Sequence, residues 1–134
     1  LKIAEENGQN LKITDRVEWR QGDYLKAFDE EDIFDGIFSN PPYIPTKDIG
    51  GLSREVKHEP RLALDGGTDG LYFYHLLAKG AAEHLKPGGF LAVEFGIGQA
   101  TDILEMFRKS AQYEDFEVIK DYGGIERALY CRKK

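Results

Sequence analysis

The tetrad Asn40-Pro41-Pro42-Tyr43 is the part of this sequence best suited to chemistry, and it directly follows a short apolar stretch, residues 35–38. A proline has no backbone N–H and holds the residue before it extended, so this segment is stiff and presents carbonyl oxygens without competing donors. The side-chain oxygen of Asn40 adds another acceptor. Such acceptors can fix both N–H bonds of a planar –NH₂ group, which leaves its lone pair pointing out of plane at an electrophilic carbon. Tyr43 can stack on the planar group and turn its ring face toward a cationic sulfonium. The tetrad therefore predicts a methyl-acceptor site for a planar nitrogen.

A simpler interpretation of the tetrad is a turn that ends a strand, because Asn and Pro are common turn residues. The apolar stretch before it favours the functional interpretation. Short apolar runs in α/β proteins are buried parallel strands, and ligand sites lie at the carboxyl ends of such strands.

Strand and helix patterns alternate along the chain, which predicts an α/β sheet with right-handed crossovers. Strands are expected at residues 17–20, 33–39, 90–95, 116–122 and 127–132, and the last two form a closing antiparallel hairpin through Gly123-Gly124. Helices are expected at residues 70–85, where Asp69 can cap the first turn, and at 99–109. Residues 1–7 have the pattern of a helix end with Gly8 as its terminator.

The tetrad and the segments around it resemble the release-factor glutamine methyltransferases in order and spacing. The resemblance is carried by 39–45, Glu55-Val56, Glu59-Pro60, Ala63-Leu64, Gly66-Gly67, Asp69-Gly70-Leu71, Pro87-Gly88-Gly89, Glu94-Phe95-Gly96 and Gln99. The tetrad alone is shared with adenine and cytosine amino-methyltransferases. The stretch from Glu59 to Leu71 makes the match specific.

This resemblance implies a Rossmann-like class I methyltransferase fold and S-adenosylmethionine as cofactor. Its substrate would be the side-chain amide of a glutamine in a peptide chain release factor. In that family a Gly-rich loop and a second strand ending in an acid lie upstream of the matched region. Residues 1–134 are therefore expected to be a single partial catalytic domain, the C-terminal portion of a longer enzyme without the first two strands, whose own activity is open. The first strand here would then lack its usual neighbours, so pairing with another chain is possible.

Within the resemblance, the expected catalytic residues are Asn40, Pro41, Pro42 and Tyr43, and Asn40 also belongs to the expected cofactor site. Asp23 and Tyr24 are candidates for the adenine rim, because the acid can accept from the exocyclic amine and the ring can pack on the base. A simple turn at Asp23 is an equally good interpretation. Gly96-x-Gly98 before a helix can be a cofactor loop, although its place after a later strand favours a tight strand-to-helix turn.

Composition restricts the function classes. The 134 residues carry 18 basic and 24 acidic side chains, a formal net charge of −6, which disfavours general nucleic-acid binding. One cysteine, Cys131, excludes an internal disulfide framework and fits a near-core strand position in a reducing cytoplasm. The sequence shows no membrane span or leader, and its three histidines have no metal-ligand spacing, so neither a membrane nor a metal is expected.

Two alternatives to glutamine methylation remain at this stage. One is methylation of an adenine or guanine amine in nucleic acid, and the other is an inactive piece that only folds or oligomerises. A cluster of mixed charge has two interpretations as well, a solvated loop or a partner-docking segment; it comprises Arg54, Glu55, Lys57, His58, Glu59 and Arg61.

Overall fold

The structure is a computed structural model that describes residues 1–134, apart from the side chain of Lys57. It contains two compact units, residues 1–30 and residues 31–134. The prediction of a single catalytic domain is not tested by this division and stays a prediction.

The first unit contains helix α1 (Lys2–Asn10) and a short 3-10 turn (Tyr24–Ala27). The prediction that Gly8 ends the helix is wrong, because α1 continues to Asn10. Gly8 is the buried residue of the helix, and a Cβ atom there would overlap the indole ring of Trp19. This glycine is therefore explained by close packing. The strand expected at 17–20 is also wrong: these residues are irregular, and the described residues of the first unit include no strand with which they could pair.

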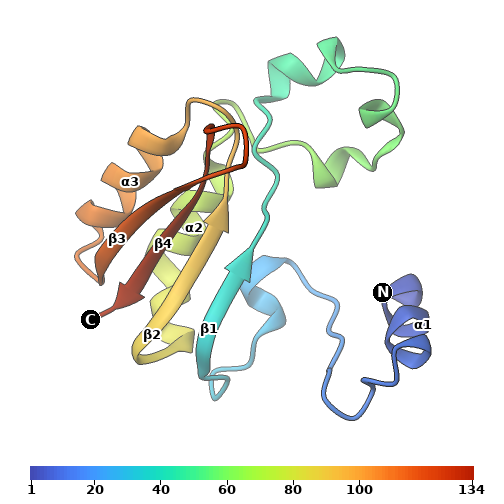
Figure 1. The fold of residues 1–134 in the computed structure, drawn as a ribbon, viewed down its shortest axis with the longest axis vertical. Helices are drawn as coiled ribbons and strands as arrows, with labels where there is room; N and C mark the ends of the chain where they lie inside the picture. The colour runs from blue at the N-terminus through green and yellow to red at the C-terminus, as the bar shows by residue number, and fades with distance from the viewer. The chain divides into compact units, whose positions relative to one another are not determined.

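The second unit is built on a four-stranded sheet in the order β1-β2-β4-β3 (Figure 1). Its strands are β1 (Phe34–Ser39), β2 (Leu85–Glu94), β3 (Tyr113–Lys120) and β4 (Glu126–Lys133). β1 and β2 are parallel, whereas β4 is antiparallel to both β2 and β3. The predicted mixed α/β sheet with a closing antiparallel hairpin is confirmed. β1 and β2 therefore bring their carboxyl ends to one edge of the sheet, where a ligand site is expected.

The turn expected at Pro87-Gly88-Gly89 lies inside β2 instead of before it. Phe34 pairs with Leu85 and Gly36 with Phe90, so residues 86–89 loop out of the ladder as an irregularity in an otherwise paired strand. Gly88 has φ +73°, a left-handed conformation that glycine adopts without a steric penalty. The expected turn is present, but β2 already begins at Leu85, before the turn.

Helix α3 (Ala100–Lys109) packs on β3 and β4. Helix α2 (Tyr72–Gly80) packs against α3 and reaches β2 through the Tyr74 hydroxyl, which donates to the Glu94 carbonyl (2.7 Å). The helix expected at 70–85 is shorter than predicted, because a 3-10 turn (Ala81–His84) replaces its last turn. Asp69 accepts a hydrogen bond from the Leu71 N–H (2.9 Å) in the turn before α2 and does not cap the helix itself. The largest fully buried side chains of the core are Tyr74, Leu77, Leu85, Leu91, Val93, Phe95, Ile103, Phe107, Leu129 and Cys131.

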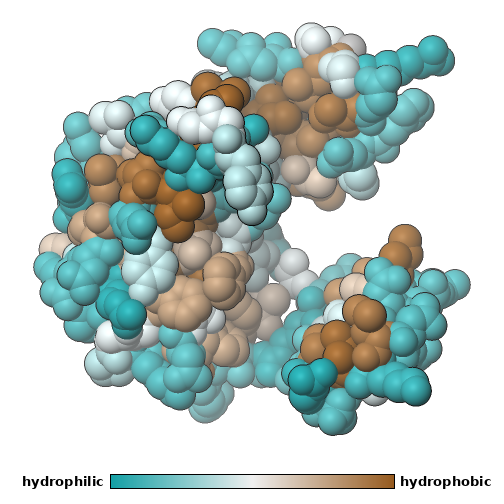
Figure 2. Space-filling model, viewed as in Figure 1, coloured by the Kyte–Doolittle hydropathy of each residue, from teal (hydrophilic) through white to brown (hydrophobic). Residues whose placement is uncertain are grey.

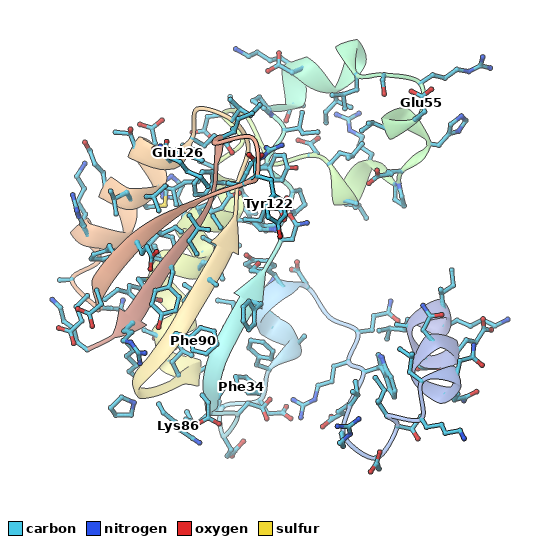
Figure 3. The ribbon with its side chains drawn as sticks, viewed as in Figure 1. Phe34, Glu55, Lys86, Phe90, Tyr122 and Glu126 are labelled. Carbon is cyan, nitrogen blue, oxygen red and sulfur yellow. The ribbon has the colours of Figure 1, made fainter. Side chains whose placement is uncertain are left out.

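Aromatic side chains lie side by side on the face of the sheet opposite the helices. Figure 2 shows apolar groups among hydrophilic ones on this face. The Phe90 ring lies 5.1 Å from that of Phe38, edge to face, and 5.8 Å from that of Tyr130, stacked. Phe90 is labelled on β2 in Figure 3. Phe38 is 79% exposed, although it comes just two residues before the tetrad.

Candidate active site at the carboxyl end of β1

The tetrad lies where β1 ends, at the sheet edge expected for a ligand site. Asn40 follows the last residue of β1 and is exposed, whereas Pro41 is buried. Among the described residues, neither Asn40 nor Pro41 takes part in a hydrogen bond, so the Asn40 amide and the Pro41 carbonyl are available to a ligand. The backbone explains this arrangement, because two successive prolines stop the ladder that β1 would otherwise continue.

The loop formed by residues 65–70 packs directly against the second half of the tetrad. Ile44 forms an isolated parallel bridge with Asp65, and the Gly66 N–H donates to the Ile44 carbonyl (2.9 Å). A Cβ atom on Gly66 would lie 2.8 Å from both the Pro42 oxygen and the Tyr43 Cα. Glycine is needed here because the two backbone segments approach so closely.

Asp65 fixes the start of this loop. Its carboxylate accepts from the Thr46 hydroxyl (2.6 Å), from the Gly67 N–H (3.1 Å) and from the Arg61 guanidinium (3.3 Å). The Thr46 hydroxyl is the main cause that holds the pKa of Asp65 below its ordinary value, followed by the Gly67 N–H; partial burial opposes them, and Arg61 adds a smaller effect. As an ionised group, Asp65 therefore links the start of the loop to Thr46 and Arg61.

Gln99 connects the tetrad to β2. The Gly96 N–H donates to Gln99 Oε1 (2.8 Å), while Gln99 Nε2 donates to the carbonyls of Tyr43 (3.0 Å) and Gly70 (3.3 Å). Gly96 leaves little room for movement, since a Cβ atom there would lie 3.0 Å from both Gln99 Oε1 and the Tyr43 ring.

Asn40 stands in the wall of two separate hollows. One hollow of about 460 Å³ lies between the tetrad and the segment that carries the 3-10 turns, where Figure 3 labels Glu55; it is lined by Asn40, Pro41, Tyr43, Ile44, Leu52, Val56, Glu59, Ala63 and Leu64. The other, of about 390 Å³, is lined by Phe38, Ser39, Asn40, Ala92, Val93, Glu94, Ile119 and Ala128. A group held by Asn40 can therefore be approached from two sides.

No family model matches this chain. A release factor glutamine methyltransferase of Moorella thermoacetica is 41% identical over 134 residues, which are 100% of this chain and 47% of that protein. A protein of the same name from Geobacter sulfurreducens is 53% identical over 97 residues, 72% of this chain and 34% of that protein. The chain is homologous to part of the release factor glutamine methyltransferases.

The predicted resemblance to this family is confirmed, and the matched region is a C-terminal portion of the relatives. The chain spans about half the length of the Moorella protein and a third of the Geobacter protein. Among solved structures, a methyltransferase from Pyrococcus furiosus is similar with a TM-score of 0.52 and 27% identity, over 77% of this chain and 42% of that one. The predicted fold class agrees with this neighbour.

The two expected cofactor residues outside the tetrad belong to the first unit. Asp23 directly precedes the turn that begins at Tyr24, and its exposed carboxylate pairs with Lys26 Nζ (2.6 Å). Tyr24 has φ +57°, which is uncommon for a residue with a side chain. The two residues are neighbours in a well-defined turn, and their role in the methyltransferase cofactor site stays a prediction.

Residues 96–99 form the tight turn between β2 and α3 that the sequence favoured over a cofactor loop. Gly98 has φ +85°, and the Gly96 N–H is already bound by the Gln99 side chain. In the described part of the chain, no group of three or more His, Cys, Asp or Glu side chains could hold a metal ion. No helix among the described residues is long and apolar enough to cross a membrane.

The positioning contacts of Gln99 and Asp65 were not predicted from the sequence. Gln99 was part of the family resemblance, but nothing in its sequence neighbourhood shows that it contacts Tyr43, which lies 56 positions earlier. A usable signal was the density of glycines at 66, 70 and 96, because such glycines often mark close backbone approaches.

Proposed function

We propose that this chain forms the acceptor half of an S-adenosylmethionine-dependent methyltransferase, which methylates the side-chain amide of a glutamine in a peptide chain release factor. One observation carries the proposal. The Asn40 amide and the Pro41 carbonyl have no hydrogen-bond partners among the described residues, and Asn40 lines two hollows at the carboxyl end of β1.

In this proposal the Asn40 side-chain oxygen and the Pro41 carbonyl accept the two N–H bonds of the substrate amide. Two of the other tetrad carbonyls are less available: that of Tyr43 accepts from Gln99, and that of Pro42 lies against Gly66. An amide nitrogen is a weak nucleophile, because its lone pair is delocalised into the carbonyl. Fixing both N–H bonds favours a geometry in which the lone pair points out of the amide plane, which is catalysis by positioning and electrostatics.

S-adenosylmethionine supplies, when bound, an electrophilic methyl group on a sulfonium. The substrate nitrogen forms the new N–C bond as the S–C bond breaks, and the sulfur keeps the electron pair. The nitrogen is then positively charged and acidic, so its proton can leave to water without a strong base. The role of Asn40 and Pro41 is to hold the nitrogen throughout and to accept from N–H bonds that become stronger donors as positive charge develops.

The residues present fit a part of the cofactor. The hollow of about 390 Å³ is largely apolar and has Phe38 and Glu94 among its lining residues next to Asn40, so a cationic sulfonium could lie near the ring of Phe38 there. The acceptor amide would then lie in the other hollow, beside Tyr43. Asp23 and Tyr24 are proposed to contact the adenine.

The proposed partner is a protein and the proposed location is the cytoplasm, where release factors act. The net charge of −6 gives the chain no general attraction for a nucleic-acid backbone. The hollow beside the tetrad combines apolar side chains with the polar groups of Asn40, Tyr43 and Glu59, which suits a peptide segment that inserts one amide side chain.

The test is the replacement Asn40→Ala in the full-length protein, assayed with radiolabelled S-adenosylmethionine and a purified release factor. Losing one preorganised acceptor is expected to lower kcat by about 100-fold to 1,000-fold. Because Asn40 is exposed and unbonded, the free energy of unfolding should change by less than about 0.5 kcal/mol. Asn10→Ala, at the exposed end of α1, is the control and should leave kcat unchanged. Parallel losses of activity and stability in Asn40→Ala would contradict the proposed role.

A further inference from the structure

The side-chain amide of Gln99 lies where three segments of the second unit meet. Its oxygen accepts from the Gly96 N–H after β2, and its nitrogen donates to the carbonyls of Tyr43 and Gly70. The residue itself is anchored at the start of α3, where the Ile103 N–H donates to the Gln99 carbonyl (3.1 Å). Both donors and one acceptor position of this amide are thus used in the surroundings of the tetrad.

We propose that Gln99 is a positioning residue for the acceptor site: by holding the Tyr43 carbonyl, it keeps this carbonyl from competing with the Asn40 side chain and the Pro41 carbonyl for the substrate amide. The inference rests on the proposed function. Gln99 touches neither substrate nor cofactor in this account and acts through Tyr43.

The hydrogen-bond pattern fixes the orientation of the Gln99 amide. If the amide were flipped, its NH₂ group would face the Gly96 N–H, and its oxygen would face the carbonyls of Tyr43 and Gly70. Each of the three hydrogen bonds would become a repulsive contact. The side chain is therefore held in one state, and the Tyr43 carbonyl always has a donor.

Close packing adds to this restraint. A Cβ atom on Gly70 would lie 2.7 Å from Gln99 Nε2 and would also overlap the Tyr43 carbonyl oxygen. On the other side, a Cβ atom on Gly96 would lie 3.0 Å from the Tyr43 ring and from Gln99 Oε1. Tyr43 therefore lies close to both glycines, and the hydrogen bond from Gln99 holds its carbonyl in this position.

Releasing the Tyr43 carbonyl should have a catalytic consequence. A free carbonyl next to Pro42 is a competing acceptor for the substrate –NH₂ group, and it would permit binding in which the nitrogen lone pair is misdirected. Binding would then persist while productive geometry became rare. This predicts a fall in kcat with little change in KM for the release factor.

Three variants of the full-length protein test the proposal. Gln99→Met keeps the length of the side chain and removes all its hydrogen bonds. Gln99→Glu keeps the acceptor for the Gly96 N–H but replaces the donor by a carboxylate oxygen facing two carbonyls. Gln112→Met is the control, because the Gln112 amide also donates to a backbone carbonyl, that of Lys79 (3.3 Å), in a different part of the fold.

The expected result is a fall in kcat of about 10-fold to 100-fold in Gln99→Met, with KM changed less than about threefold. The fall in kcat should be at least as large in Gln99→Glu as in Gln99→Met, whereas the kcat of Gln112→Met should match that of the wild type. If Gln99 only anchored the turn through Gly96, Gln99→Glu would be the milder variant, and that order would overturn the proposal. Unchanged kcat in Gln99→Met would overturn it as well. An inactive wild-type protein would instead overturn the proposed function, and the positioning role with it.

Discussion

Replacing Gly70 by alanine should damage the second unit more than the same replacement at Gly98. Both glycines adopt left-handed backbone conformations, with φ +79° at Gly70 and φ +85° at Gly98. Alanine in this region costs about 1–2 kcal/mol at either position. Alanine also restricts the unfolded chain to the same extent in both variants, so this effect cancels in the comparison.

The two positions differ in the space around the added methyl group. No atom lies within 4 Å of a Cβ on Gly98, whereas a Cβ on Gly70 would overlap the Tyr43 carbonyl oxygen and lie 2.7 Å from Gln99 Nε2. Overpacking against backbone adds about 1–3 kcal/mol. We therefore expect the free energy of unfolding to fall by about 1–2 kcal/mol in Gly98→Ala and by about 2–5 kcal/mol in Gly70→Ala.

Urea unfolding followed by far-UV circular dichroism measures this difference. Circular dichroism reports on the sheet and helices, whereas the single tryptophan, Trp19, belongs to the first unit and would report on that unit. A methylation assay adds a second readout, because only Gly70→Ala should displace the tetrad. Equal losses of stability within about 0.5 kcal/mol would refute the account of how residues 65–70 pack on the tetrad.

Four further predictions concern single features of the chain. Gly8→Ala should destabilise the first unit and shift the fluorescence of Trp19, because the methyl group overlaps the indole; the stabilisation usual for Gly→Ala in a helix would contradict this packing. Burial raises the pKa of Cys131 to about 12, so its thiol should resist a thiol reagent at neutral pH in the native protein and react only after unfolding; prompt native labelling would show that the strand opens. The pKa of Asp65 is lowered in the folded state, so the wild type should be more stable than Asp65→Asn above the unfolded pKa of about 3.9. This extra stability should vanish as the pH falls through the folded pKa, and a folded pKa of about 3.9 or higher, measured by NMR, would contradict the prediction. Since β1 is a terminal strand of the sheet, mass measurement after size exclusion should show dimers or larger species of the 134-residue chain, and a monomer at all concentrations would exclude association through this edge.

The sequence was sufficient for the elements that have strong local signals. The periodic apolar pattern of α3, the apolar run of β1 and the glycine turn between β3 and β4 each predict an element that the structure contains. The tetrad could also be placed at a strand end, because two prolines directly after an apolar run have few other compatible conformations.

The errors occur where tertiary packing overrides a local signal. Gly8 looks like a helix terminator but makes room for Trp19, and the residues around Trp19 form no strand because they lack a partner strand. The network at Gln99 could not be predicted, because it joins positions 43, 70 and 99 through backbone carbonyls that carry no sequence signal.

The most direct measurement is to locate the methyl group that the full-length protein transfers. The protein would be incubated with S-adenosylmethionine and a purified release factor, and then separately with nucleic acid, before fragment mass spectrometry of each product. We predict one added methyl group on the side-chain nitrogen of a glutamine in the release factor, and its loss in Asn40→Ala. A methyl group on an adenine or guanine amine, or a methylated release factor with Asn40→Ala as active as the wild type, would contradict the account.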